Sequence, residues 1–239
     1  MGKVRAVSPF LPDRTGAIVS QLIGLFPTPV MRVPGLLEPD AVAALAAEAQ
    51  DATSLTNAYS SLLSHTPVAG AEANSLHGRL GALVLPKVAE FGEVLFGEAL
   101  TWQIKEIWVN VLEPGGHQAI HTHANSFISG VVYLTEAHPS ANIVFHKSIG
   151  GTGFLFGNSN PNARVNAFNG GKWAMPETRA GDLVMFPSYL LHEVPANRGE
   201  RRISIAFNAI PDRLDNFGDA IRFARAGDLF RNSRCTPPP

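Results

Sequence analysis

The second half of the chain is a succession of short apolar or alternating segments, each ended by turn residues. Successive side chains of a strand point to opposite faces, so runs of this kind predict β-strands. Strands this short and this evenly spaced favour an antiparallel sandwich or barrel. We expect strands at residues 101–112, 118–123, 127–135, 142–146, 163–168, 172–176, 182–186, 189–194 and 202–210.

The first hundred residues have a different pattern, and two segments there predict helices. Glu38–Asp51 has Pro39 in its first turn, acidic residues early and alanines in the middle, all of which favour a helix. Leu76–Leu95 repeats apolar residues close to the helical period, and Pro86 is expected to kink or split it. These helices are expected to support one side of a sheet.

The segments around these helices predict less regular structure. Residues 1–26 are expected to form an arm lying on the domain. Phe26–Val33 is strand-like, but its two prolines restrict it to the edge of a sheet. Thr53–Ser75 is rich in Ser, Thr and Asn and predicts a loop, whereas Asp215–Ala226 predicts a C-terminal helix.

The chain shows no internal repeat and no linker, so we expect one domain over residues 1–239. It would comprise an N-terminal arm with supporting helices (1–99), a β core (100–212) and a C-terminal helix with a tail (213–239). The Gly- and Asn-rich segment 147–171 is long for a connection in a compact domain. It is either a long surface hairpin or a lid over a site.

Composition excludes several classes of protein. With 45% apolar residues and a net charge of −1, the chain resembles an ordinary globular protein, and nothing suggests binding to nucleic acid or to a membrane. The apolar run Ile18–Phe26 is too short for a membrane span. Cys235 is the single cysteine, which excludes an intrachain disulfide and fits a reducing, cytoplasmic compartment.

Two histidines in Glu113–Leu134 suggest a metal site. His121 and His123 follow a Pro-Gly-Gly turn signal and are two residues apart, so on a strand both imidazoles would point to one face and could hold one metal ion. A third suitable imidazole, His192, lies in a later strand-like segment.

A second site is indicated by Arg202 and Ser204, which would share one face of the last core strand while Ile203 and Ile205 occupy the other. An unpaired buried guanidinium is costly, and no carboxylate of the chain obviously pairs with it. A bound carboxylate, held by Arg202 and Ser204, would satisfy this requirement.

These segments together carry a family resemblance. The chain resembles the 2-oxoglutarate/Fe(II) dioxygenase superfamily in the order of four segments. These are His-x-His, VVYL, GDLVMFPSYLLHEV and an Arg-x-Ser ten residues past His192. Within it, the chain is most similar to a 2OG-Fe(II) oxygenase subgroup with an H-x-H motif. The resemblance covers about residues 100–210. It implies a mainly β fold: a double-stranded β-helix (jelly-roll, cupin-like) core buttressed by N-terminal helices and a short C-terminal helix.

The resemblance also implies a metal centre. His121 and His192 would be Fe(II) ligands, and His123 stands where the superfamily usually has a carboxylate. That substitution removes one negative charge from the ligand set, which makes the choice of metal less certain.

The cosubstrate site is implied in the same way. Arg202 and Ser204 would bind the distal carboxylate of 2-oxoglutarate, with Tyr133 and Asn110 as further contacts. The implied reaction is the oxidation, by default hydroxylation, of an unidentified small-molecule or peptidyl substrate by O2, with release of succinate and CO2. No dedicated general base is required.

Other interpretations stay open. A three-histidine, cupin-like metalloenzyme that does not use 2-oxoglutarate is favoured by His123 and disfavoured by the Arg202-x-Ser204 pair. A metal-binding jelly roll without catalysis is the third alternative, and a homodimer is not excluded. His117 and Asn125 are candidates for positions behind the ligands or against the substrate, and His117 could equally be a solvated loop residue.

Overall fold

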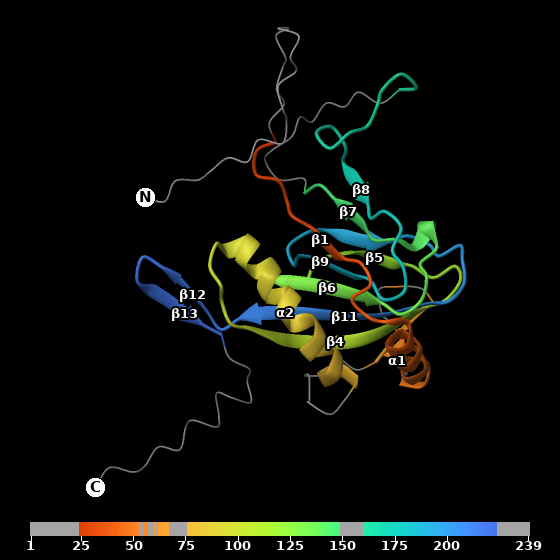
Figure 1. The fold of residues 1–239 in the computed structure, drawn as a ribbon. Helices are drawn as coiled ribbons and strands as arrows, with labels where there is room; N and C mark the ends of the chain where they lie inside the picture. Colours follow the sequence, from red (N-terminus) through yellow and green to blue (C-terminus); the bar gives the residue numbers. More distant parts are fainter. Residues whose placement is uncertain are drawn as a thin grey trace, which may run out of the picture.

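The computed structural model describes residues 24–52, 55–56, 60, 62–66, 76–148 and 160–223. Within this part of the chain, two helices cover one face of a seven-stranded sheet, and a four-stranded sheet lies on the side away from the helices (Figure 1). This arrangement confirms the predicted mainly β, jelly-roll fold with supporting helices.

All neighbouring strands of the large sheet are antiparallel. Their spatial order is β1 (Met31–Val33), β9 (Leu183–Pro187), β6 (Ile128–Tyr133), β11 (Arg202–Pro211), β4 (Trp102–Leu112), β3 (Leu63–His65) and β2 (Leu55–Thr56). β1 lies at one edge, as the two prolines just before it predicted.

The small sheet is also antiparallel. Its order is β5 (Gln118–His121), β10 (His192–Val194), β7 (Val144–His146) and β8 (Lys172–Ala174). A short 3₁₀ helix, η1 (Pro139–Ala141), precedes β7. Because strands far apart in the sequence pair here, residues from both halves of the core meet at one place.

The alternation of side chains in β4 and β11 divides the interior into two parts. Val109 and Val111, like Ile203 and Ile205, face the helices and belong to the larger apolar core. The side chains of Asn110, Arg202 and Ser204, on the opposite face of these strands, face the small sheet. A strand turns successive side chains to opposite faces, so each of these strands supplies both the core and a site.

The two predicted helices form, as α1 (Pro39–Ala52) and α2 (Leu76–Phe96), and cover the large sheet (Figure 1). Helix α2 runs through Pro86 as one helix, contrary to a split. Proline has no backbone N–H, so the carbonyl of Ala82 lacks its intrahelical hydrogen-bond donor. Both residues are exposed, and water can donate to that carbonyl instead. The buried face of α2 carries Leu80, Val84 and Phe91.

Three sequence predictions need correction. The segment expected to be a loop at 53–75 contains β2 and β3, because the edge of β4 offers a free ladder to which β3 adds. The strand expected at 163–168 is absent: the Asn166 and Asn169 side chains accept hydrogen bonds from backbone amides, which replaces a ladder with turns.

The third correction concerns the C-terminal helix expected at 215–226. Its described residues form instead a hairpin of β12 (Arg213–Asn216) and β13 (Asp219–Arg222). The two turn residues, Phe217 and Gly218, have φ angles of 57° and 93°, which a right-handed helix cannot include. The last residues of the expected helix, 224–226, lie outside the described residues.

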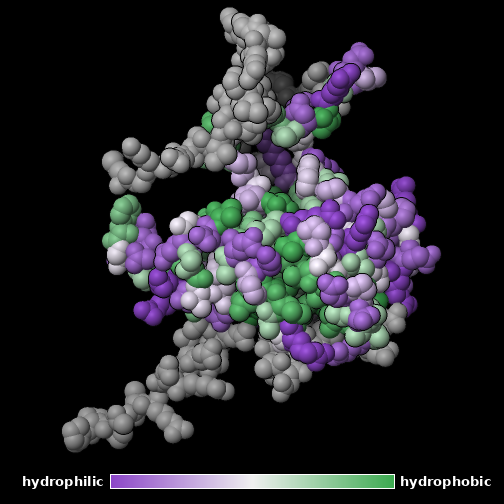
Figure 2. All heavy atoms as spheres, viewed as in Figure 1, coloured by the Kyte–Doolittle hydropathy of each residue, from purple (hydrophilic) through white to green (hydrophobic). Residues whose placement is uncertain are grey.

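The expected N-terminal arm lies outside the described residues up to residue 23, and so does Cys235. Neither helix in the described ranges has the length and apolar character required to cross a bilayer. Apolar residues reach the surface on the face that carries α2, as Figure 2 shows, and Leu83 and Val94 are exposed there.

Candidate metal centre and adjoining cavity

Three histidines come together at one end of the small sheet. His121 at the end of β5 and His192 at the start of β10 are direct cross-strand partners. His123 lies just past β5, where its backbone N–H donates to the carbonyl of Ser188 at 3.1 Å. One nitrogen of each ring lies within 4.8 Å of the others, so the three can hold one metal ion.

Two of these rings are oriented by backbone carbonyls. Nδ1 of His121 lies 2.7 Å from the carbonyl of Ala119, and Nδ1 of His192 lies 2.8 Å from that of Leu190. A carbonyl only accepts hydrogen bonds, so each Nδ1 carries the proton and each Nε2 keeps a free lone pair. This is the arrangement that a histidine ligand needs.

The three imidazoles are neutral at physiological pH. Burial, and then the neighbouring His121, lower the pKa of His192 to about 3. The same two causes lower the pKa of His123 to about 4. Burial also lowers the pKa of His121, against a smaller opposing effect of its bond to Ala119. Neutral imidazole is the form that binds a metal.

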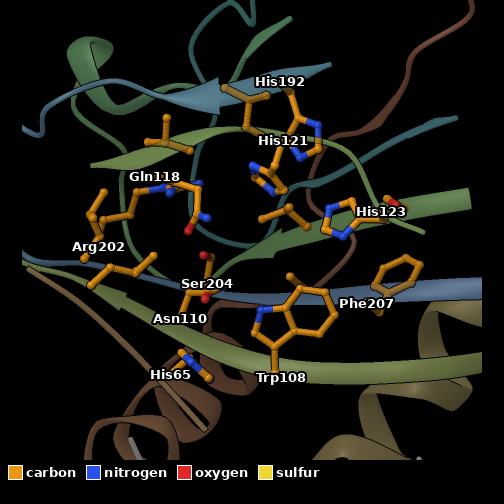
Figure 3. A pocket seen from close by; sticks show the side chains of 18 of the residues that line it. His65, Trp108, Asn110, Gln118, His121, His123, His192, Arg202, Ser204 and Phe207 are labelled. Atoms are coloured by element: carbon orange, nitrogen blue, oxygen red, sulfur yellow. The ribbon is translucent and has the colours of Figure 1, made fainter. Parts of the chain in front are cut away.

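The histidines line a cavity of about 280 Å³ between the two sheets. Figure 3 shows the three rings toward one side of it and Arg202, Ser204 and Asn110 toward the other. The structure therefore brings the predicted metal ligands and three of the four predicted cosubstrate residues to one cavity.

The register of the large sheet explains this grouping. Ser204 on β11 is the direct partner of Asn110 on β4 and of Tyr133 on β6, so the three side chains stand in one row across the sheet. His65 on β3 extends that row beyond Asn110. Arg202 stands two residues farther along β11, on the same face.

Arg202 is buried, with 5% of its surface exposed. Its Nε has no hydrogen-bond partner, and among the described residues no carboxylate pairs with the guanidinium. Its Cζ lies 4.9 Å from the centre of the Tyr133 ring, a cation–π contact. Tyr133 is fully buried, outside the cavity lining, and its hydroxyl also has no partner. These two unpaired groups suit a carboxylate ligand, as the sequence suggested.

Among the cavity residues that were not singled out from the sequence are Trp108, Gln118 and His65. Trp108 lies two residues before Asn110 on β4, so strand alternation could have identified it; its ring centre is 5.9 Å from that of His123. Gln118 lines the cavity from β5. His65 lines it from β3, in a segment predicted to be a loop, and no signal in the sequence places it there.

Two residues with open roles do not line the cavity. His117 is half-buried in the connection before β5, and it belongs neither to the cavity lining nor to the histidine cluster. Asn125 is exposed and has a φ of 53°, a left-handed conformation that asparagine tolerates in turns. Glu193, next to His192, bonds to His146 at 2.9 Å and does not belong to the histidine cluster.

The segment 147–171 is predicted to be either a long surface hairpin or a lid. Residues 149–159 lie outside the described residues. The described parts, 147–148 and 160–171, contribute no residue to the cavity lining.

A chain of hydrogen bonds lies beside His123. Ser129 bonds to Ser188 at 2.8 Å and donates to Oδ1 of Asn208 at 2.7 Å. Nδ2 of Asn208 donates to Glu106 at 2.8 Å and lies 3.5 Å from Nδ1 of His123. The two serines and Asn208 are buried.

Comparison with known proteins agrees with this geometry. Residues 106–208 match the model of the family described as "Putative 2OG-Fe(II) oxygenase". This range contains all seven residues predicted for the metal and cosubstrate sites. No curated protein matches the chain.

Solved structures share the fold. An oxidoreductase of the 2OG-Fe(II) oxygenase family from Burkholderia pseudomallei is 14% identical, with a TM-score of 0.53, and the match covers 75% of this chain and 83% of that one. HygX from Streptomyces hygroscopicus, solved with nickel and 2-oxoglutarate, is 14% identical, with a TM-score of 0.57 and coverage of 77% and 83%.

A prolyl-4-hydroxylase from Pseudomonas putida is 19% identical, with a TM-score of 0.51 and coverage of 76% and 92%. Each of the three matches covers at least three-quarters of this chain. The jelly-roll core of this chain, residues 106–208, is thus similar to the 2OG-Fe(II) oxygenase family, and the chain shares its fold with a solved oxidoreductase of that family.

Proposed function

We propose that this protein is an Fe(II)- and 2-oxoglutarate-dependent oxygenase that hydroxylates a small molecule or a peptidyl side chain. One observation carries the proposal. Arg202 is buried without a carboxylate partner among the described residues, in the wall of the cavity that the three histidines line. A cation in that position needs an anionic ligand, and the ligand must lie next to the metal centre.

His121, His123 and His192 would hold the metal. Their donor set fits Fe(II), because imidazole is a suitable ligand for it and three protein ligands leave further coordination positions open. The carbonyls of Ala119 and Leu190 keep two of the rings in the ligating tautomer before metal arrives. The site is thus largely preorganised.

Arg202 would bind the distal carboxylate of 2-oxoglutarate, with Ser204 donating from its hydroxyl. Both are buried, so the ion pair would form away from water and be correspondingly strong. Tyr133 has an unpaired hydroxyl beneath Arg202, and Asn110 stands beside Ser204 in the same row. We propose both as further contacts of the cosubstrate.

When bound, Fe(II) and 2-oxoglutarate would supply the oxidising chemistry, in which O2 and 2-oxoglutarate yield succinate, CO2 and the oxidised substrate. The chain itself would orient the reactants and exclude water. Ile143, Phe186 and Val194 line the cavity from three strands or their flanks and are buried. No side chain needs to act as a general base.

A second candidate is a three-histidine metalloenzyme that does not use 2-oxoglutarate. His123, in place of the usual carboxylate, favours this alternative. It leaves Arg202 without an anionic partner, and the first candidate therefore accounts for more of the site.

Anaerobic addition of Fe(II) and 2-oxoglutarate to the metal-free protein tests the proposal. Chelation of Fe(II) by 2-oxoglutarate should produce a visible charge-transfer band, which a three-histidine enzyme of the second kind would not give. A protein that binds Fe(II) stoichiometrically and shows no band on saturation with 2-oxoglutarate would overturn the proposal.

A further inference from the structure

The pairing of β4 with β11 is irregular at one point close to the metal centre. Asn208 pairs with Glu106, but the next residue of β11, Ala209, pairs with Ile104. Lys105 is therefore an extra residue, and β4 has a bulge there. A bulge re-aims neighbouring side chains, and both Lys105 and Glu106 are half-buried between the buried Ile104 and Ile107.

The bulge creates an ion pair. Nζ of Lys105 lies 2.8 Å from Oε1 of Glu106, and Oε2 of the same carboxylate accepts the amide of Asn208 at 2.8 Å. Burial by itself raises the pKa of Glu106, but the hydrogen bonds from Lys105 and Asn208 outweigh it and lower the pKa. Glu106 is thus a carboxylate at neutral pH.

The Asn208 amide lies between this carboxylate and His123. The amide oxygen accepts a hydrogen bond from Ser129, and the amide nitrogen donates one to Glu106. A flip of the amide would place its oxygen against the carboxylate, so this orientation is fixed. The same nitrogen lies 3.5 Å from Nδ1 of His123. His121 and His192 have a backbone carbonyl behind Nδ1, whereas His123 has this amide and, beyond it, a charge.

His123 is also the ligand whose position usually brings a negative charge to such a centre. We propose that Glu106 tunes the metal centre: Asn208 holds its carboxylate behind His123, and from there it supplies the negative charge that a third imidazole lacks. This inference rests on the metal site of the proposed function and does not depend on 2-oxoglutarate.

Charge-removing substitutions on the two sides of one ion pair test it. Glu106→Gln keeps an oxygen that can accept from Asn208 but leaves Lys105 as an uncompensated cation near the site. Lys105→Gln leaves the negative charge. If charge matters, the two substitutions act in opposite directions, whereas a structural role for the ion pair makes both weaken the site alike.

The measurement is the affinity of the metal-free protein for Co(II), by titration without cosubstrate and by competition with a chelator. Glu106→Gln should weaken binding about 10-fold, the lower end of the usual effect of a group behind a ligand. Lys105→Gln should bind equally or more tightly, and the double variant should return toward wild type. Glu90→Gln, which removes an exposed carboxylate on α2, is the matched control and should change affinity less than about twofold.

Unchanged affinity in Glu106→Gln, or equal losses in both single variants, would overturn the inference. If Glu106→Gln does not fold, Lys105→Gln decides by itself, because weaker Co(II) binding in that variant contradicts the proposed charge effect. A wild-type protein that binds Co(II) but not 2-oxoglutarate would refute the proposed function and leave this inference standing.

Discussion

His121 and His192 are direct cross-strand partners in the small sheet, and their ring centres lie 4.2 Å apart. The backbone ladder between β5 and β10 therefore holds two candidate ligands at a fixed separation. Residues opposite one another in an antiparallel pair are close on the same face, so no loop has to order for the pair to form. His123 joins them from beyond the end of β5.

The first prediction concerns these ligands. His121→Ala or His192→Ala should abolish stoichiometric binding of Fe(II) or Ni(II), because each removes one of three donors from a site with no spare ligand among the described residues. Isothermal titration and metal analysis after dialysis measure this. His138→Ala, at an exposed histidine, is the control and should bind normally. Stoichiometric metal in both ligand variants would rule out the site.

The second prediction concerns Arg202. Arg202→Ala should weaken 2-oxoglutarate binding roughly 30- to 150-fold, the equivalent of about 2–3 kcal/mol for charge-assisted hydrogen bonds, while metal binding stays. The readout is the 2-oxoglutarate dependence of the charge-transfer band. Arg201→Ala, which removes the neighbouring exposed arginine paired with Glu113, should leave that dependence unchanged. The role of Arg202 is wrong if both variants behave alike.

The third prediction concerns pH. An unfolded histidine takes up a proton as the pH falls through about 6.5, whereas folded His192, with a pKa of about 3, stays neutral. The unfolded state then binds more protons, so the metal-free protein loses stability as the pH falls below about 6.5. The loss attributable to His192 should be roughly 1 kcal/mol between pH 7.5 and 5.5.

Urea unfolding at these two pH values tests this. His192→Asn should lose less stability on acidification than the wild type, because it lacks one of the histidines. A metal-free protein that is more stable at pH 5.5, or a variant with the same pH dependence as the wild type, would contradict the prediction.

The fourth prediction concerns packing beside the cavity. A Cβ at Gly130 on β6 would lie 2.3 Å from Cζ of Phe207, which is fully buried. Gly130→Ala should lower the free energy of unfolding by about 1–3 kcal/mol. Gly171→Ala, where a Cβ meets no atom within 4 Å, is the matched control and should be neutral. Thermal and urea unfolding of both proteins give the comparison.

Local patterns predicted much of the fold. Strand periodicity placed Arg202 and Ser204 on the face opposite Ile203 and Ile205, and the structure has that arrangement. The helical period predicted both α1 and α2. It failed at the C-terminus, where two turn residues with positive φ convert an apparently helical segment into a hairpin.

The site was predictable where its residues follow such local patterns. The spacing of His121 and His123 indicated a shared metal, and His192 was a third suitable imidazole in a later strand-like segment, which the family resemblance then implied as a ligand. His65 could not be predicted, because it reaches the cavity only when β3 pairs with β4. Glu106 could not be predicted either, since its direction depends on a bulge in the pairing of β4 with β11.

The sequence by itself determined which side chains are available on which face of each strand, because that depends on a two-residue period within one segment. Tertiary structure alone decided which strands pair and in what register, and therefore that His192 stands against His121 and that Asn110, Ser204 and Tyr133 form one row. Register is a property of two segments at once, set by packing between residues far apart in the chain. The sequence therefore identified the candidate ligands, whereas the position of the Glu106 carboxylate behind His123 was apparent only in the tertiary structure.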